Sequence, residues 1–600
     1  MANVRVYQYG CSSRATLDGA ALGQLRLAHE LRNSLVEIER AHAERVADGW
    51  ASRPDVAGLI ARLAGLDAEI VVAVESVTRW RASARSKGQP PTDLSAPLRE
   101  LKAARKTLRE HVRDAKRATY DALAPTFHAA YGERRAAIRR LYALYVQERG
   151  LYWPTFNDVV AHHEAAMQSI AAQRKKGMPA EIRFHRWTGE GTLTMQLQAT
   201  AGKALASPGL LSHHDDPENP FRGVLQIPVL TNGLEGRAGI VRGPMKMRIG
   251  SQGPGNREPV WCELPVIWHR PIPEDGVVKR VQVTQRMVGS RARVTVAVTV
   301  NLAEEPVIEH LPGAIGIDIG WRQLTDGAVR VATFVSTTPF PRLTGPIIEE
   351  GWLRLSHDRC SGQLVVPDRA AGYMTRLAAT RSARDKALDL LKVAVAETVD
   401  ADEAFATAIG GDDGPLTSAI VARWRSPARF ARLAHEARNA APDHELTVKM
   451  LAWDRHDRHV RDIEAHGRDK HLGYRDEMYR VFAAACASSF GSVQLNAFEL
   501  TRLAKVPDPL DGEDYGEAVV RSRRTFVAPS SLVGAISNAA KRERCRFDDS
   551  PIVGRVHEVC GAVLTGDPIL SHMMRCDACG LDIDQDGATA RRLRDRVTTA

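Results

Sequence analysis

Apolar residues recur every three or four positions through most of the first part of the chain. In the opening stretch they share one face of a 3.6-residue period: Leu22, Leu25, Leu31, Leu35 and Ile38. Proline and glycine are scarce here, except between Gly88 and Pro97, where the pattern breaks. The spacing predicts long amphipathic helices from residue 16 to about residue 175.

The pattern changes near residue 182 to short runs in which apolar and polar residues alternate. The runs at 192–197 and 281–285 are rich in β-branched residues, and clusters of glycine and proline separate such runs. A turn at Gly289 and Ser290 joins two of them, which predicts a β-hairpin. We expect a small β-barrel to extend to about residue 300.

A third pattern begins at Gly313 with an apolar, β-branched run that ends at Gly320 and carries one acid, Asp318. A carboxylate on a buried strand is costly unless it is paired or binds a cation. Helical patterns around 370–400 and 428–488 follow, then a short strand at 492–495 and a last helix. By itself the glycine-flanked acid is weak evidence for a particular function, because many nucleotide-binding strands end in this way.

Two pairs of metal-ligand residues lie near the C-terminus. His557 and Cys560 form one x-x-spaced pair, and Cys576 and Cys579 form a second pair after fifteen intervening residues. Such spacing is typical of a tetrahedral Zn²⁺ site, because each short turn supplies two ligands at one corner of the ion. The spacing predicts a structural zinc ribbon at about 553–581; the alternative is scattered free thiols and a surface histidine.

Composition favours a polyanionic partner. The 600-residue chain has a formal net charge of +10 at pH 7, although a solvated surface could account for that excess. We find no leader sequence and no run of eighteen apolar residues, so neither secretion nor membrane insertion is expected. Cysteines without an evident pairing pattern fit a reducing bacterial cytoplasm.

Basic residues gather between positions 101 and 140, where eleven Lys or Arg face four Asp or Glu. Four arginines in this segment recur at every fourth position: Arg105, Arg109, Arg113 and Arg117. On a helix this spacing places guanidinium groups roughly 6 Å apart, close to the separation of successive phosphates on a nucleic-acid strand. The stripe is a candidate nucleic-acid contact, and a salt-bridged outer face is the alternative.

The order of these parts resembles one family along the whole chain: the single-RuvC, RNA-guided effectors of type V CRISPR systems and their TnpB relatives. The matching segments are 3–10 (first wedge strand), 31–40 (recognition helix), 183–191 (return to the wedge), Asp318, Cys576–Cys579 and Asp586. By this resemblance Asp318 and Asp586 are the first and last RuvC aspartates. The family usually has an asparagine where this chain has Ala588.

The middle RuvC motif departs from the family pattern. Matching Phe498 and Leu500 to the family's two leucines places Asn496 where the metal-binding glutamate belongs. A neutral amide offers one oxygen acceptor and no charge, so it binds Mg²⁺ poorly. Glu499 is the alternative ligand, although a three-residue shift on a strand reverses the side-chain face. A compensating carboxylate from Asp582 or Asp584 is a further alternative.

The resemblance implies a multidomain α+β protein with a helical recognition lobe, a wedge β-barrel and a RuvC (RNase H-like) domain with an inserted zinc ribbon. We expect the first wedge strand at 1–15, the lobe at 16–180, the barrel at 181–310 and the RuvC-like domain at 311–600. The implied cofactors are structural Zn²⁺ and a weakly bound or single Mg²⁺ at the degenerate site.

The implied function is RNA-guided binding of double-stranded DNA, most like the compact type V-M effectors, which block transcription without cutting. The expected partners are a guide RNA (crRNA) and target DNA with a short T-rich flanking motif, in a monomeric ribonucleoprotein. Processing of the guide RNA is the enzymatic activity that would remain. The alternative is a metal-dependent, RNA-guided endonuclease with Asp318, Glu499 and Asp586 as ligands; a transposon-encoded TnpB-like nuclease is a third interpretation.

Overall fold

In the computed structural model the chain folds as two units, residues 1–306 and 307–600. The structure describes residues 3–12, 15–87, 95–175, 180–196, 225–226, 241–252, 258–269, 277–302, 312–410, 414–424, 426–496, 526–550, 556–557, 559–565 and 573–598. None of the described helices combines the length and the apolar character that a membrane-spanning segment needs.

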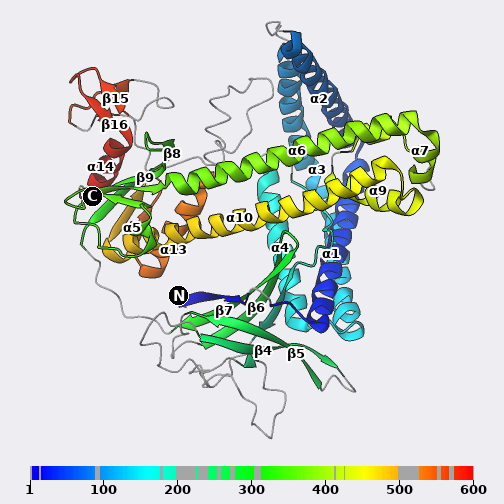
Figure 1. Cartoon of the computed structure of the whole chain (residues 1–600), viewed down its shortest axis with the longest axis horizontal. Coiled ribbons are helices and arrows are strands. Elements are labelled where there is room, and N and C mark those ends of the chain that lie inside the picture. The colour runs from blue at the N-terminus through cyan, green and yellow to red at the C-terminus, as the bar shows by residue number, and fades with distance from the viewer. Residues whose placement is uncertain are drawn as a thin grey trace. The chain divides into compact units, whose positions relative to one another are not determined.

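Long helices form the first part of the first unit, as the apolar spacing predicts (Figure 1). They are α1 (Gly19–Ala51), α2 (Pro54–Lys87), α3 (Ser95–Tyr142), the short π-helix η1 (Ala143–Glu148) and α4 (Trp153–Lys175). Helix α1 begins where the Asp18 side chain accepts a hydrogen bond from the Ala21 backbone N–H at 2.7 Å. Of its predicted apolar stripe, Leu25, Leu31 and Leu35 are buried, whereas Leu22 is exposed and Ile38 is half-buried.

A seven-stranded antiparallel sheet completes the first unit. Its order is β2 (Gly191–Gln196), β6 (Val277–Val288), β7 (Arg291–Leu302), β1 (Asn3–Cys11), β5 (Glu258–Trp268), β4 (Val241–Gln252) and β3 (Leu225–Gln226). Strand β2 also lies against β4, so six strands nearly close into a barrel. The predicted hairpin is confirmed: β6 turns into β7 at Gly289, whose φ of +61° favours glycine.

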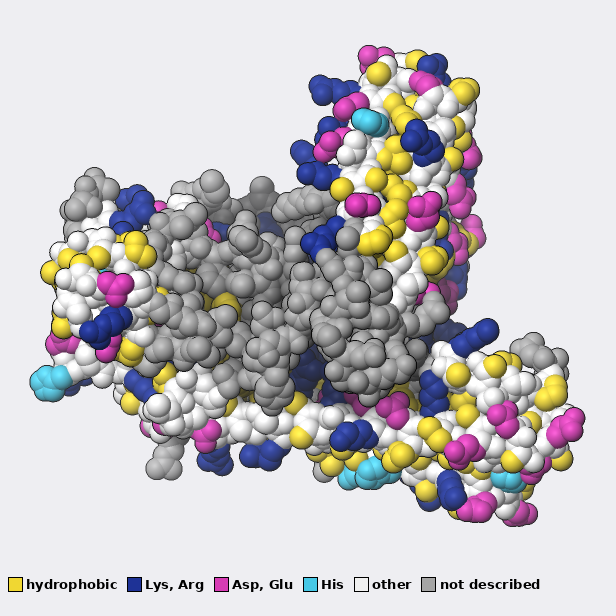
Figure 2. Space-filling view, turned by 90° about the horizontal axis from the view of Figure 1, so that it is seen from above, with side chains coloured by type: hydrophobic (Ala, Val, Ile, Leu, Met, Phe, Trp, Pro, Cys, Tyr) yellow, Lys and Arg dark blue, Asp and Glu magenta, His cyan; other side chains and the backbone are white. Residues whose placement is uncertain are grey.

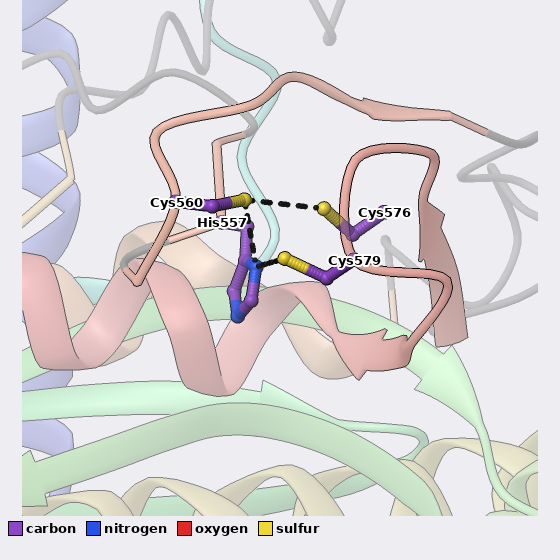
Figure 3. Close-up of side chains that lie close together, drawn as sticks. All are labelled: His557, Cys560, Cys576 and Cys579. Carbon is purple, nitrogen blue, oxygen red and sulfur yellow. Dashed lines mark hydrogen bonds between the residues drawn. The ribbon is translucent and has the colours of Figure 1, made fainter.

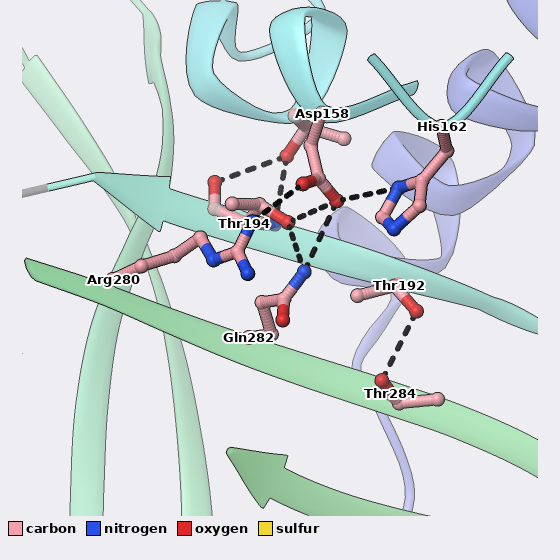
Figure 4. A network of polar contacts seen from close by, with 8 residues as sticks. Asp158, His162, Thr192, Thr194, Arg280, Gln282 and Thr284 are labelled. Atoms are coloured by element: carbon pink, nitrogen blue, oxygen red, sulfur yellow. Dashed lines mark hydrogen bonds and ion pairs between the residues drawn. The ribbon is translucent and has the colours of Figure 1, made fainter. Parts of the chain in front are cut away.

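A buried polar network attaches helix α4 to this sheet (Figure 4). Asp158 of α4 accepts hydrogen bonds from the Thr194 hydroxyl at 2.8 Å and from Gln282 Nε2 at 3.1 Å. Its other oxygen pairs with Arg280 at 3.2 Å, and His162 lies 3.3 Å away. Because a buried carboxylate must be satisfied, these contacts fix the helix on β2 and β6.

The second unit contains a six-stranded mixed sheet. Its order is β10 (Leu353–Leu355), β11 (Ser361–Val366), β9 (Val329–Ser336), β8 (Ala314–Gln323), β12 (Ser492–Leu495) and β13 (Arg546–Asp548). Strand β9 is antiparallel to β8, whereas β12 runs parallel to β8 and β13 runs parallel to β12. The first six residues of β8 and all of β9 are buried, which explains why both strands are largely apolar.

Helices cover both faces of this sheet. Helices α10 (Glu445–Ser489) and α13 (Pro529–Glu543) share a core with one face, and Ile315 and Ile317 of β8 belong to that core. Helix α14 (Gln585–Thr598) packs over Gly316, where a Cβ atom would lie 2.1 Å from the Ala590 carbonyl oxygen. Because side chains alternate along a strand, Asp318 shares the Gly316 face and points toward α14.

The remaining helices extend away from the sheet. Helix α6 (Asp368–Ala401) runs beside α10, and the two meet a small helical core at their far ends (Figure 1). That core contains α7 (Glu403–Gly410), α8 (Ser418–Ala422) and α9 (Pro427–Ala440), while α5 (Pro346–Glu349) precedes β10. The structure thus confirms the predicted helical stretches around 370–400 and 428–488 on the residues that it describes.

A three-stranded antiparallel sheet precedes α14. It consists of β14 (Leu564–Thr565), β15 (Met573–Cys576) and β16 (Asp582–Asp584), and its small core includes Leu564, Met574 and Ile583. Strand β16 ends at the residue before α14 begins. The last helix is therefore attached directly to this small sheet.

Candidate functional site

Three of the residues singled out in the sequence meet at the junction of β8, β12 and α14. Strands β8 and β12 pair in register at Ile317 and Leu495, so the next residues, Asp318 and Asn496, are neighbours. The Asn496 amide Nδ2 donates to Asp318 Oδ1 at 3.4 Å. Asp586 approaches from α14, and its charge acts directly on Asp318. The geometry thus brings together Asp318, Asn496 and Asp586.

An arginine that the sequence analysis missed lies at this junction. Arg330 of β9 points its guanidinium at α14, where Nη1 donates to Asp584 Oδ2 at 3.0 Å and Nη2 donates to Asp586 Oδ2. Its side chain is 2% exposed. The available signal was a lone charged residue, Arg330, inside the mostly apolar run of 328–335. A buried charge of this kind requires a partner.

Burial governs the electrostatics of this carboxylate centre, by which we mean Asp318, Asn496, Asp584, Asp586 and Arg330. Burial raises the pKa of Asp318 well above its usual range, and the neighbouring Asp586 charge raises it further. Burial also lowers the pKa of the Arg322 guanidinium, an effect that the Asp586 charge opposes. The two aspartates therefore repel each other, and the arginines counter that repulsion.

The other carboxylates predicted as ligands of this centre differ in where they lie. Asp584 joins it through Arg330, and it also accepts the Asp586 backbone N–H at 3.1 Å. Asp582 instead lies on the surface, 3.6 Å from Arg575 Nη1. Glu499 lies outside the described residues. A pair of divalent ions requires several free carboxylate oxygens, and the described residues do not fit that requirement, because Arg330 already holds oxygens of Asp584 and Asp586.

The four predicted zinc ligands lie together in a separate cluster (Figure 3). The ligand atoms of His557, Cys560, Cys576 and Cys579 all lie within 4.8 Å of one another. His557 Nδ1 is 3.1 Å from Cys560 Sγ and 3.5 Å from Cys579 Sγ, and the Cys560 and Cys576 sulfurs are 3.4 Å apart. A tetrahedral Zn²⁺ spaces such atoms roughly 3.5–3.8 Å apart. The donor set therefore fits a structural metal ion.

Two similar turns present these ligands. In the first turn, the backbone N–H of Gly561 donates to the His557 carbonyl at 2.9 Å; in the second, Gly580 donates to Cys576 at 2.7 Å. Both glycines have φ near +70°, at +73° and +70° respectively. This left-handed conformation lets each chain segment reverse just after its second ligand. The local sequence thus explains why each pair converges.

The arginine stripe on α3 is divided between paired and exposed side chains. Arg105 pairs with Asp67 of α2, and Arg113 lies 3.3 Å from the carboxylate of Asp114. Arg109 and Arg117 are exposed. On the face drawn in Figure 2, basic and acidic side chains are interspersed over much of the described surface. Arg105 and Arg113 thus fit the salt-bridged outer face, whereas the exposed Arg109 and Arg117 fit a nucleic-acid contact.

Comparison with known proteins gives full-length relatives, whereas no protein-family profile matches the chain. The chain is 31% identical to a CRISPR-associated DNA-binding protein Cas12m of Gordonia otitidis, over 100% of both chains. It is also 31% identical to a Cas12m of Mycolicibacterium mucogenicum, over 98% of this chain and 97% of that one. A Cas12m of Allomeiothermus silvanus is 27% identical, over 99% and 97%.

Among solved structures, the chain is similar to the protein of a Cas12f1–sgRNA–target DNA complex, with 8% identity and a TM-score of 0.35 over 99% of each chain.

Proposed function

Because the chain belongs to the Cas12m family of CRISPR-associated proteins, we propose that it is an RNA-guided effector that binds double-stranded DNA and silences its target by blocking transcription. The observation that carries this proposal is the end-to-end similarity to relatives named as DNA-binding proteins. In such an effector, base pairing with the guide supplies sequence specificity, and the protein contacts mainly backbone and duplex shape.

The carboxylate centre supports binding without cleavage. RuvC-type cleavage uses two divalent ions, one to activate water and one to stabilise the leaving oxygen. Here an amide, Asn496, lies beside Asp318 where a third carboxylate would be needed, and a guanidinium holds Asp586. Cleavage of DNA with Asp318, Glu499 and Asp586 as metal ligands is therefore not favoured.

We assign the domains by the resemblance noted from the sequence. Residues 1–15 and 181–310 would form the wedge barrel, 16–180 the recognition lobe, and 311–600 the RuvC-like domain. The mixed sheet, with an antiparallel strand beside the one that carries Asp318, supports an RNase H-like domain. Arg109 and Arg117 would contact nucleic-acid phosphates, whereas Arg105 and Arg113 already have acidic neighbours.

We assign Zn²⁺ to the Cys₃His cluster and a structural role to the ion. Three thiolates and one imidazole are a closed ligand set, with no position left for substrate. The chain would act as a monomeric ribonucleoprotein with its crRNA, on DNA that carries a short T-rich flanking motif.

The experiment that tests this function separates binding from cutting. The purified complex with guide is incubated with a labelled matching duplex in Mg²⁺ or Mn²⁺, and a duplex with mismatches next to the flanking motif serves as control. We expect stable binding to the matched duplex and no cleavage on the scale of about one event per minute. Cleavage at that rate, or equal binding to both duplexes, would refute the proposal.

A further inference from the structure

A buried arginine pairs with two aspartates of the carboxylate centre. We propose that the Arg330 guanidinium takes the place of the divalent ions and prevents them from binding at the centre. This effect would be independent of the amide at Asn496. This inference deepens the proposed function. It rests on that function only in comparing the centre with that of a two-metal nuclease. It concerns how the centre is kept inactive.

The contacts of Arg330 are specific and buried. One guanidinium nitrogen donates to Asp584 and a second nitrogen donates to Asp586, so the group bridges the last residue of β16 and the first turn of α14. The strand that carries Arg330 is fixed on both sides: β9 pairs with β8 at Arg322 and with β11 at Val365. The side chain therefore has little freedom to move away.

The charges of the centre are already close to balance. Asp318, Asp584 and Asp586 supply three carboxylates, and Arg330 and the nearby Arg322 supply two guanidinium groups. A Mg²⁺ ion needs an octahedral set of oxygens at about 2.0–2.1 Å. An ion coordinated by Asp586 Oδ2 would displace Arg330 and leave a buried guanidinium without one of its partners. An ion on the other Asp586 oxygen would lie beside the guanidinium charge and be repelled by it.

Arg330 and Asn496 act on metal binding in different ways. The amide removes a ligand, whereas the guanidinium adds a positive charge and occupies existing ligands. Restoring a carboxylate at position 496 would therefore leave the blocking cation in place. Metal binding would return only when the guanidinium is also removed.

The first test is a Mn²⁺ titration of the zinc-loaded full-length protein. Calorimetry and electron paramagnetic resonance measure the binding of Mn²⁺. The variants are Arg330→Met, Asn496→Glu and their combination, and Arg384→Met is the matched control. Arg384 is likewise a largely buried arginine with two acidic partners, Asp457 and Glu464, both at 2.9 Å. This control separates the loss of a buried ion pair from an effect on the carboxylate centre.

We expect Arg330→Met to bind Mn²⁺ at least about tenfold more tightly than the wild type, and the double variant about a hundredfold more tightly. Arg384→Met should leave Mn²⁺ affinity unchanged. Folded Arg330→Met that binds Mn²⁺ no more tightly than the wild type would overturn the inference. Tight Mn²⁺ binding at the centre of the wild-type protein would overturn it as well.

A second measurement keeps the inference testable if Arg330→Met does not fold. Without divalent ions, removing one acid from a metal-ready cluster relieves repulsion and raises Tm. Here Asp586→Asn should lower Tm, because Arg330 loses a buried partner. A raised Tm would contradict the inference.

Guided DNA binding by the wild-type protein is measured in parallel. Its absence would refute the proposed function and leave the Mn²⁺ and Tm results readable by themselves.

Discussion

The Cys₃His cluster and the carboxylate centre, two of whose aspartates follow the cluster by a few residues, differ in how they accommodate cations. In the cluster, four donor atoms converge within 4.8 Å, and their spacing fits an added ion. In the carboxylate centre, Arg330 already pairs with Asp584 and Asp586. The first site needs an external ion to be complete, whereas the second is complete with the chain's own charge. The presence of ligand residues is thus a poor guide to metal binding until neighbouring charges are known.

Removing one ligand of the Cys₃His cluster should have the strongest effect on the protein. Cys576→Ser should lose the bound ion and loosen residues 573–584, because a structural Zn²⁺ contributes roughly 10 kcal/mol or more to ordering a small module. Metal analysis and hydrogen exchange check this, with Cys360→Ser as control, since Cys360 lies outside the cluster. A full equivalent of zinc in Cys576→Ser would contradict the ligand assignment.

The second prediction concerns the carboxylate centre and displaces α14, the helix that carries Asp586. Gly316→Ala would place a Cβ atom 2.1 Å from the Ala590 carbonyl oxygen and 2.5 Å from the Arg594 nitrogen. Because both contacts are backbone atoms, we expect a loss of about 3 kcal/mol in the free energy of unfolding. Gly534→Ala in α13 is the matched control, because no heavy atom lies within 4 Å of its added Cβ. Equal denaturation midpoints for the two variants would count against the close packing of α14.

The third prediction compares two aspartates of the same short strand. Asp584→Asn should cost about 2 kcal/mol, because Asp584 pairs with buried Arg330; the asparagine oxygen can still cap the first turn of α14. Asp582→Asn should change stability by less than about 0.5 kcal/mol, since its pair with Arg575 is exposed. Chemical denaturation of both variants measures the difference. Equal losses would show that Arg330 does not depend on Asp584.

Asn496→Glu alone should change metal binding little. The sequence alone suggests that Asn496→Glu would restore metal binding, but the Arg330 guanidinium remains in this variant. We therefore expect Mn²⁺ affinity to change by less than about threefold, against the much larger gain in the double variant. A single titration series measures both. A large gain in Asn496→Glu alone would mean that Arg330 yields its partners readily.

The sequence was informative where a short motif carries its own geometry. The x-x spacing of the two ligand pairs predicted their convergence, and the family resemblance placed Asn496 at a ligand position of the site that contains Asp318, beside which the structure places it. It was uninformative about partners distant in the chain. Arg330 lies 256 residues from Asp586, and its strand shows no motif of its own. The choice of Asp584 over Asp582 likewise depends on where β16 meets α14, which spacing does not specify.

The placement of Asp584 has a consequence for how this part of the protein unfolds. Asp584 is the last residue of the sheet that carries Cys576, and it also holds Arg330 beneath α14. Loss of order in the small sheet would therefore release one anchor of the helix. We therefore expect the small sheet, α14 and the strand that carries Arg330 to unfold together. If Zn²⁺ occupies the Cys₃His cluster, as proposed, its loss would also loosen α14, a helix that contributes no ligand to the cluster.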